Sequence, residues 1–193
     1  MTKSAIVSAE FASKFATEKE TPYTRWVREE GLEIISSFYV PDLHTVELKP
    51  WPRRGGRGVY LNHDASRTSN DCYVCEIPAG KSLAPQRQLY EEMIYVLDGR
   101  GSTAVWNNAG QRVSFEWKAG AIFAIPLNCW HQHFNADADK PARALVLKSK
   151  PMFMFMNMLF QQLVEPRPTE PAPGTARHQA REAELDFNHP EED

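Results

Sequence analysis

Short apolar or alternating runs recur between about residue 58 and residue 148, and residues typical of turns separate them. The runs read GVYLNH, CYVCEI, EMIYVLD, STAVWN, RVSFEW, AIFAIP, HQHFN and ARALVLK. Pairs such as Ala79-Gly80, Asp98-Gly99 and Ala119-Gly120 stand between them. Short strands at regular spacing with such turn signals are typical of an all-β sandwich or barrel. No helical period of comparable strength interrupts this region, so we predict an all-β fold.

The flanking segments have different patterns. Residues 1–20 predict an arm, and Thr21-Pro22 begins a short predicted helix that Gly31 would end. The Met-rich stretch PMFMFMNMLFQQL (151–163) predicts a terminal strand or helix, and the charged, Pro-rich residues after it predict a flexible tail. We therefore divide the chain into an N-terminal arm with leading strands (1–57), a β-barrel (58–163) and a flexible, Pro-rich and acidic tail (164–193).

Composition narrows the class of protein. Of the 193 residues, 42% are hydrophobic and 24% charged, which indicates one globular domain with a sizeable core. The 22 basic residues nearly balance the 25 acidic ones, and this argues against nucleic acid as a partner. The sequence contains no run of about 18 apolar residues, so we predict no membrane-spanning segment. The first residues also lack the apolar region of a signal peptide. Three cysteines suit a reducing compartment, so we expect a cytoplasmic protein.

Two local motifs suggest chemistry that their context does not favour. Cys72 and Cys75 form a C-x-x-C pair, but DCYVCEIP predicts a strand, on which residues three apart point to opposite faces. Thiols so placed do not readily share a metal, and we interpret both as strand cysteines. The loop KPWPRRGGRG (49–58) has four cationic residues without the spacing of a phosphate-binding loop, so we interpret it as a solvated turn.

One candidate site begins in the segment GKSLAPQRQLYEEMIYVLDG (80–99). Gln86 and Gln88 are two residues apart on a predicted strand, so both side chains leave the same face. Glu92 begins the next strand and shares a face with Ile94 and Val96. A carboxylate buried beside these aliphatic side chains needs a cation or hydrogen-bond donors.

A second segment, GAIFAIPLNCWHQHFN, contains the other candidate residues. His131 and His133 alternate on one predicted strand and therefore share a face. Four positions follow Gly120 at fixed spacing, namely Pro126, Asn128, His131 and Asn135.

Together these segments resemble the paired motifs of the cupin superfamily over roughly residues 75–148. The first cupin motif is glycine, five residues, His-x-His, three or four residues, glutamate, six residues and glycine. The second is glycine, five residues, Pro-x-Gly, two residues, histidine, three residues and asparagine. Every spacing fits, but Gln86 and Gln88 replace the two histidines and Asn128 replaces a glycine. The resemblance, to single-domain cupins of the gentisate-dioxygenase-like type, implies a cupin-type double-stranded β-helix (jelly-roll) barrel, here with an N-terminal arm and a short helix.

The resemblance also implies one divalent metal inside the barrel. Carried over by position, its ligands are Gln86, Gln88, Glu92 and His131. Amide oxygens are weak, hard donors, so the loss of two imidazoles should lower the affinity for transition metals. The expected metal is Fe2+, with Mn2+, Ni2+ or Zn2+ as alternatives. Another arrangement recruits His133, giving a set of Glu92, His131 and His133.

Three functions remain open at this stage. The resemblance implies a divalent-metal-dependent, dioxygenase-like enzyme for a small organic substrate, with aromatic compounds as the leading class, and it implies a homodimer. A non-catalytic, small-molecule-binding cupin is the first alternative, because Gln86 and Gln88 could hydrogen-bond Glu92 and His131 without a cation. A metal-independent isomerase or lyase is the second, with His131 or His133 as the catalytic base.

Overall fold

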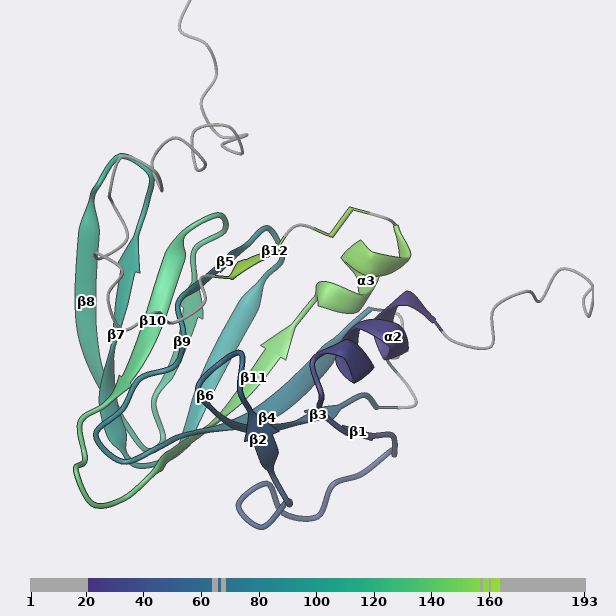
Figure 1. Cartoon of the computed structure of the whole chain (residues 1–193), viewed down its shortest axis with the longest axis horizontal. Coiled ribbons are helices and arrows are strands. Elements are labelled where there is room, and N and C mark those ends of the chain that lie inside the picture. The colour runs from purple at the N-terminus through teal and green to yellow at the C-terminus, as the bar shows by residue number, and fades with distance from the viewer. Residues whose placement is uncertain (1–20, 64–65, 67–68, 157, 160, 164–193) are drawn as a thin grey trace, which may run out of the picture.

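In the described part of the chain, two β-sheets face each other, and two helices lie at one side of them (Figure 1). The computed structural model describes residues 21–63, 66, 69–156, 158–159 and 161–163. The arm predicted at 1–20 and the tail predicted at 164–193 lie outside the described residues. The all-β prediction and the jelly-roll class are confirmed.

The larger sheet, called sheet A here, has seven strands. Their order is β1–β3–β4–β11–β6–β9, and β2 pairs with β3 at its side. The strands are β1 (Ile34–Ile35), β2 (Lys49–Trp51), β3 (Gly56–Leu61), β4 (Asp71–Ile77), β6 (Glu92–Asp98), β9 (Ile122–Ile125) and β11 (Ala142–Lys148).

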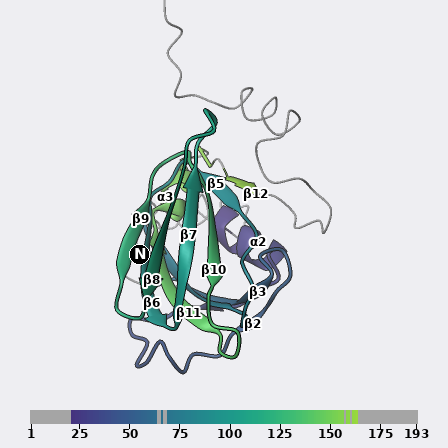
Figure 2. The ribbon, with the colours of Figure 1, turned by 90° about the vertical axis from the view of Figure 1, so that its left-hand side faces the viewer.

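The smaller sheet, sheet B, has five strands in the order β12–β5–β10–β7–β8. Figure 2 views the molecule with β7, β8 and β10 toward the reader. The strands are β5 (Gln86–Gln88), β7 (Arg100–Trp106), β8 (Arg112–Lys118), β10 (Trp130–Asn135) and β12 (Gln161–Leu163). Each apolar run that the sequence pattern marked between residues 58 and 148 coincides with one of the strands of sheet A or B.

The turns use residues that tolerate a left-handed backbone. Gly99 and Gly120 each have φ +86, a conformation that strains residues with a Cβ atom. Asn128 has φ 60, in the same region. Asparagine is among the few other residues that adopt this conformation readily. The glycine-to-asparagine departure in the second motif therefore preserves the backbone shape at that position.

Strand alternation places the core between the sheets. On β6 the side chains of Glu92, Ile94 and Val96 are buried, as the sequence pattern predicted. Cys75 belongs to the core cluster between the sheets, whereas Cys72 belongs to a separate cluster on the opposite face of sheet A. Both thiols are free, so the interpretation as strand cysteines on opposite faces is confirmed.

The helices pack beside each other at the end of sheet A (Figure 1). Helix α2 (Pro22–Glu29) starts as predicted, because the Thr21 hydroxyl oxygen accepts a hydrogen bond from the Thr24 amide at 3.1 Å. Gly31, with φ +74, follows its end. Helix α3 (Lys150–Phe155) lies directly after β11, so the Met-rich segment contains both a helix and the short strand β12. None of the helices in the described segments is long and apolar enough to cross a bilayer.

The arginine-rich loop forms the β2–β3 hairpin, and its interpretation as a solvated turn is wrong for Arg54. Arg54 is only 2% exposed, and its Nη1 donates to the Ala84 carbonyl at 2.6 Å. The guanidinium also lies over the Trp51 ring, 5.9 Å from its centroid. A hairpin folded back against the sandwich can bury one of several arginines, and residue type alone does not say which.

Candidate metal centre

Three ionisable side chains converge between the two sheets. Glu92 starts β6 in sheet A, and His131 and His133 project from β10 in sheet B. One ligand atom from each lies within 4.8 Å of the others, and all three residues are buried. Because β10 alternates, both imidazoles point inward, as the sequence predicted. The separations are close to those that a single metal ion between the side chains would require.

The two glutamines lie beside this cluster on β5, next to β10. Gln86 is the direct cross-strand partner of His131. Its Nε2 lies 3.2 Å from Glu92 Oε2 and 3.1 Å from His131 Nε2, and Gln88 Nε2 donates to the same carboxylate oxygen at 2.8 Å. Tyr73 donates to the other carboxylate oxygen at 3.4 Å. All four predicted ligands are thus brought together, with the amide nitrogens of the glutamines turned toward Glu92.

The second nitrogen of each histidine is held by a hydrogen bond. His131 Nδ1 lies 3.4 Å from the Cys129 carbonyl, which can only accept, so this nitrogen carries the proton and the lone pair of Nε2 accepts from the Gln86 amide. His133 Nδ1 lies 2.8 Å from Thr103 Oγ1, and this hydroxyl accepts a hydrogen bond from Trp117 Nε1 at 2.9 Å. His133 Nε2 is buried without a hydrogen-bond partner. A metal ion would satisfy this nitrogen, and such outer hydrogen bonds orient metal-bound histidines.

Burial sets the protonation of these groups. It lowers the pKa of His131 to about 3, and the Arg54 charge acts in the same direction. The pKa of His133 is lowered well below its usual range by burial, with smaller effects from His131 and Arg54. Burial raises the pKa of Glu92, while the charges of Arg54 and Lys148 oppose that shift. Both imidazoles are therefore neutral near pH 7, as metal ligation requires.

A row of three buried charged residues crosses sheet A at the level of Glu92. Lys148 on β11 is in register with Asp71 on β4 and with Glu92 on β6. Its Nζ lies 3.5 Å from Asp71 Oδ2 and donates to the Tyr60 hydroxyl at 3.1 Å. Tyr23 of α2 donates to Asp71 at 2.7 Å. The row links the candidate centre to the first helix.

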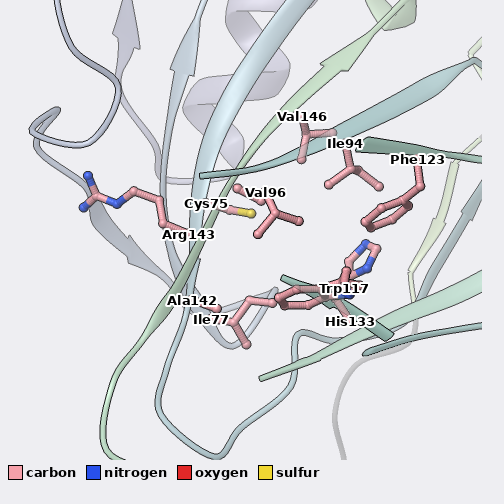
Figure 3. A pocket seen from close by; sticks show the side chains of 11 residues that line it. Cys75, Ile77, Ile94, Val96, Trp117, Phe123, His133, Ala142, Arg143 and Val146 are labelled. Atoms are coloured by element: carbon pink, nitrogen blue, oxygen red, sulfur yellow. The ribbon is translucent and has the colours of Figure 1, made fainter. Parts of the chain in front are cut away.

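A small apolar cavity borders the cluster on the side of His133 (Figure 3). Its volume is about 20 Å³, room for one water molecule. Arg143 borders the cavity with its chain, but its guanidinium points away and reaches Glu76 and the backbone near residue 44. The other residues around it are Cys75, Ile77, Ile94, Val96, Trp117, Phe123, His133, Ala142, Ala144 and Val146.

Sequence reasoning missed several residues of this region. Thr103 could have been found from strand parity, because β7 pairs with β10 and places Thr103 opposite His133. Tyr73 and Lys148 lie on strands whose neighbours the sequence does not specify. Arg54 comes from outside the motif-bearing segments. His44 and His63, which the sequence left as structural residues, bind Asp98 and the Ser37 carbonyl, respectively, and take no part in the cluster.

The comparisons with known proteins concern the domain that contains these residues. Residues 73–148 match the family model described as the cupin domain. This part of the chain is a cupin domain, and the three strands that carry the candidate ligands, β5, β6 and β10, lie within it.

The relatives are distant. Over 79 residues the chain is 27% identical to 5-aminosalicylate 1,2-dioxygenase from Comamonas sp, a match that covers 41% of this chain and 20% of that protein. The chain thus spans about a fifth of the length of this curated relative.

Solved structures support the fold. Oxalate decarboxylase from Lactobacillus farciminis, in a formate complex, superposes with a TM-score of 0.50 at 17% identity, over 65% of this chain and 37% of that chain. The cupin domain of Cnp3 from Schizosaccharomyces pombe gives a TM-score of 0.45 at 20% identity, over 56% of this chain and 71% of that one. The first likeness shows the fold alone, and the second is too loose to carry an argument.

Proposed function

We propose that this protein is a divalent-metal-dependent enzyme in which Glu92, His131 and His133 hold the metal. The observation that carries the proposal is the buried cluster itself, in which one ligand atom from each of the three residues lies within 4.8 Å of the others, together with the buried, unpartnered Nε2 of His133. Two histidines and one carboxylate are the ligand set of non-haem iron(II) oxygenases, which leaves other coordination positions open. We therefore favour Fe2+, with Mn2+, Ni2+ and Zn2+ as alternatives.

In this proposal the glutamines act in two ways. The amide N–H groups of Gln86 and Gln88 orient Glu92 by hydrogen bonds to Oε2, which leaves Oε1 toward His131 at 3.8 Å. The amide oxygen of Gln88, buried without a hydrogen-bond partner, remains available as a weak additional ligand after rotation of the side chain. The bound metal would supply a redox-active centre with open coordination positions. The residues of the chain would orient it, keep the imidazoles neutral and exclude water.

The reaction class that we propose is dioxygenase-like, on a small organic substrate, with aromatic compounds as the leading class. The support is the printed activity of the distant Comamonas relative and the apolar side chains around the cavity. The small volume of the cavity indicates that a substrate would require side chains such as Phe123 to move.

Elemental analysis followed by oxygen measurement tests this function. Protein reconstituted anaerobically with Fe2+ and then desalted should retain about one iron per chain. His133→Ala should retain far less, whereas the exposed control His44→Ala should match wild type. A panel of hydroxylated aromatic acids and neutral phenols is then screened for substrate-dependent oxygen uptake. Wild-type protein that retains no metal after separate reconstitution with Fe2+, Mn2+, Ni2+ and Zn2+ would contradict the proposal.

A non-catalytic, small-molecule-binding function is the second candidate, and one observation favours it. The amide groups of Gln86 and Gln88 already satisfy Glu92 Oε2, so the network needs no cation to remain buried. This candidate predicts ligand binding that persists in chelator and no turnover with any of the four metals.

We further propose that the protein is a homodimer. Four apolar side chains are exposed in register on the outer face of β11, β6 and β9, and the β9 end of sheet A has no further paired strand in the described part of the chain. They are Met93 (48% exposed), Tyr95 (39%), Ile122 (61%) and Leu147 (43%). A second copy presenting the same patch would bury it symmetrically.

The three free cysteines support our proposal of a cytoplasmic location.

A further inference from the structure

A row of aromatic and cationic side chains crosses the outer face of sheet B, the face turned toward the reader in Figure 2. Because both candidate histidine ligands point inward from β10, strand alternation places Trp130 on the opposite face. Trp130 is in register with Trp106 on β7, and their rings stack at 8° with centroids 6.3 Å apart. Arg87 on β5 lies 5.5 Å from the Trp130 centroid, and Arg112 on β8 lies 5.3 Å from that of Trp106. An indole pair, Trp106 and Trp130, is thus flanked by two guanidinium groups.

This row is buried although it faces away from the core. Trp130 and Arg87 are 0% exposed, and Trp106 is 7% exposed. Side chains on the outer face of a two-layer sandwich are ordinarily solvated. Arg87 donates to Asn108 Oδ1 at 2.7 Å, and Arg87, Asn108 and Trp130 each take part in a further interaction. The Nε1 of Trp106 is buried without an acceptor among the described residues. A segment that lies over the row would account for its burial.

The chain leaves sheet B beside this row. Strand β12 pairs with β5, and Gln162 is in register with Arg87. The residues that follow Leu163 read VEPRPTEPAP (164–173). From β12 to β8 the row spans four strand spacings, or about 19 Å. An extended, Pro-rich chain rises about 3.1 Å per residue, so roughly six residues cross the row. Residues 165–173, called the Pro-rich segment here, are long enough to cover it.

The chemistry of the Pro-rich segment matches the row. Such segments favour the polyproline II conformation, in which the carbonyl groups remain free to accept hydrogen bonds, and they dock on surfaces lined by aromatic side chains. Pro168 and Pro171 have the P-x-x-P spacing of such ligands. Glu165 and Glu170 outnumber the one cation of the segment, Arg167, and their charge is opposite to that of the two guanidinium groups of the row.

We propose that the Pro-rich segment docks across the outer face of sheet B of its own chain and covers the indole pair. Its prolines would pack on the indoles, and one of its carbonyl groups would accept from Trp106 Nε1. Strand β10 carries Trp130 outward and His131 inward, so the docked segment would stabilise from outside the strand that carries two candidate ligands. This inference is independent of the proposed function, because it involves neither the metal nor a substrate.

Fluorine NMR of the full chain labelled with fluorotryptophan tests the docking, because it reports on each indole separately. A soluble gadolinium chelate broadens the signals of indoles that solvent reaches. In wild type the indole pair, assigned with Trp106→Phe and Trp130→Phe, should stay as sharp as Trp117 of the core. In Pro166→Ser/Pro168→Ser/Pro171→Ser both signals should broaden several-fold more, with Trp117 unchanged. The control Pro190→Ser, outside the Pro-rich segment, should behave as wild type.

These substitutions lie outside the described strands and leave the side chains of the sandwich intact. Arg112→Glu tests the other partner, because a carboxylate at this exposed position repels Glu165 and Glu170 and should also broaden the indole pair. Arg100→Glu, exposed at the far end of β7, is the control and should not. An indole pair that is broadened in wild type, or that stays sharp in the triple proline variant, would overturn the proposal. Sharp signals that broaden on dilution of wild type would assign the cover to a second copy, which also overturns it.

Discussion

At the scale of single residues, the candidate centre depends on how each imidazole is held. His131 and His133 have their Nδ1 atoms occupied by the Cys129 carbonyl and the Thr103 hydroxyl. Their Nε2 atoms consequently face the interior, one toward Gln86 and one without a partner. Burial keeps both rings neutral. Because both rings are buried, protonating them at acid pH costs the folded protein free energy.

Stability of the metal-free protein should therefore fall with decreasing pH. The folded pKa of His131 is about 3, below the value near 6.5 of the unfolded chain, so between these values only the unfolded chain binds the proton. Each such histidine lowers the free energy of unfolding by up to about 1.4 kcal/mol per pH unit in this window. The raised pKa of Glu92 acts in the opposite sense above about pH 4.5 and offsets part of the effect.

Urea unfolding between pH 7 and pH 4 measures this slope. His131→Gln should reduce the slope by about one proton, because glutamine does not titrate. An identical slope in His131→Gln and wild type would show that His131 is protonated in the folded protein.

At the scale of the elements, sheet A and helix α2 are joined by buried charge. Lys148 contacts Asp71 across β11 and β4, and Asp71 accepts from Tyr23 of α2. Lys148 also lies over the Tyr60 and Tyr73 rings, at 4.3 and 4.7 Å from their centroids. A buried ion pair contributes little on balance, but removal of one partner leaves an uncompensated charge.

Lys148→Met should accordingly lower the free energy of unfolding by about 3–5 kcal/mol, since Asp71 then stays buried without its cation. The exposed Lys118→Met on β8 should change it by less than about 0.5 kcal/mol. The double variant Asp71→Leu/Lys148→Met should recover most of the loss, because an apolar pair removes both charges. Denaturant titration of all three distinguishes these outcomes. A loss below about 1 kcal/mol in the single variant would argue against the pairing.

The strands and turns were largely predictable from the sequence, because their signals lie within short segments of the chain. The period-2 pattern marks β6 and β10 because one face of each is buried, and glycine marks the turns because few residues adopt positive φ. The short strands β1, β2 and β12 carry no such pattern, because two or three residues show no period. Arg54 and Lys148 were missed because their burial depends on contacts between distant segments.

At the scale of the whole molecule, the sequence motifs specify which side chains lie close together but not which of them bind a metal. The prediction of Gln86, Gln88, Glu92 and His131 as ligands came from motif position and stays a prediction. The structure brings His133, the alternative ligand offered by the sequence on the same strand as His131, together with His131 and Glu92. A centre displaced toward His133 would let the glutamines serve as hydrogen-bond donors.

The proposed dimer is also a property of the whole molecule. Ile122→Glu places a charge in the exposed apolar patch on β6, β9 and β11, so it should convert a dimer to a monomer in light scattering coupled to gel filtration. Val113→Glu, at an equally exposed apolar site on β8 (63% exposed), should leave the mass unchanged. A monomeric wild-type protein, or a dimer that persists in Ile122→Glu, would contradict this interface.

The most direct measurement of the central claim is a Co2+ titration followed by visible absorption, with three proteins in parallel. If Glu92, His131 and His133 hold the metal, His133→Ala should bind Co2+ about 100-fold more weakly than wild type, whereas Gln88→Ala should lose no more than about tenfold. Wild type should show ligand-field bands that His133→Ala lacks. The opposite order, with His133→Ala binding as wild type and Gln88→Ala failing to bind, would place the metal at the glutamine positions and contradict the account.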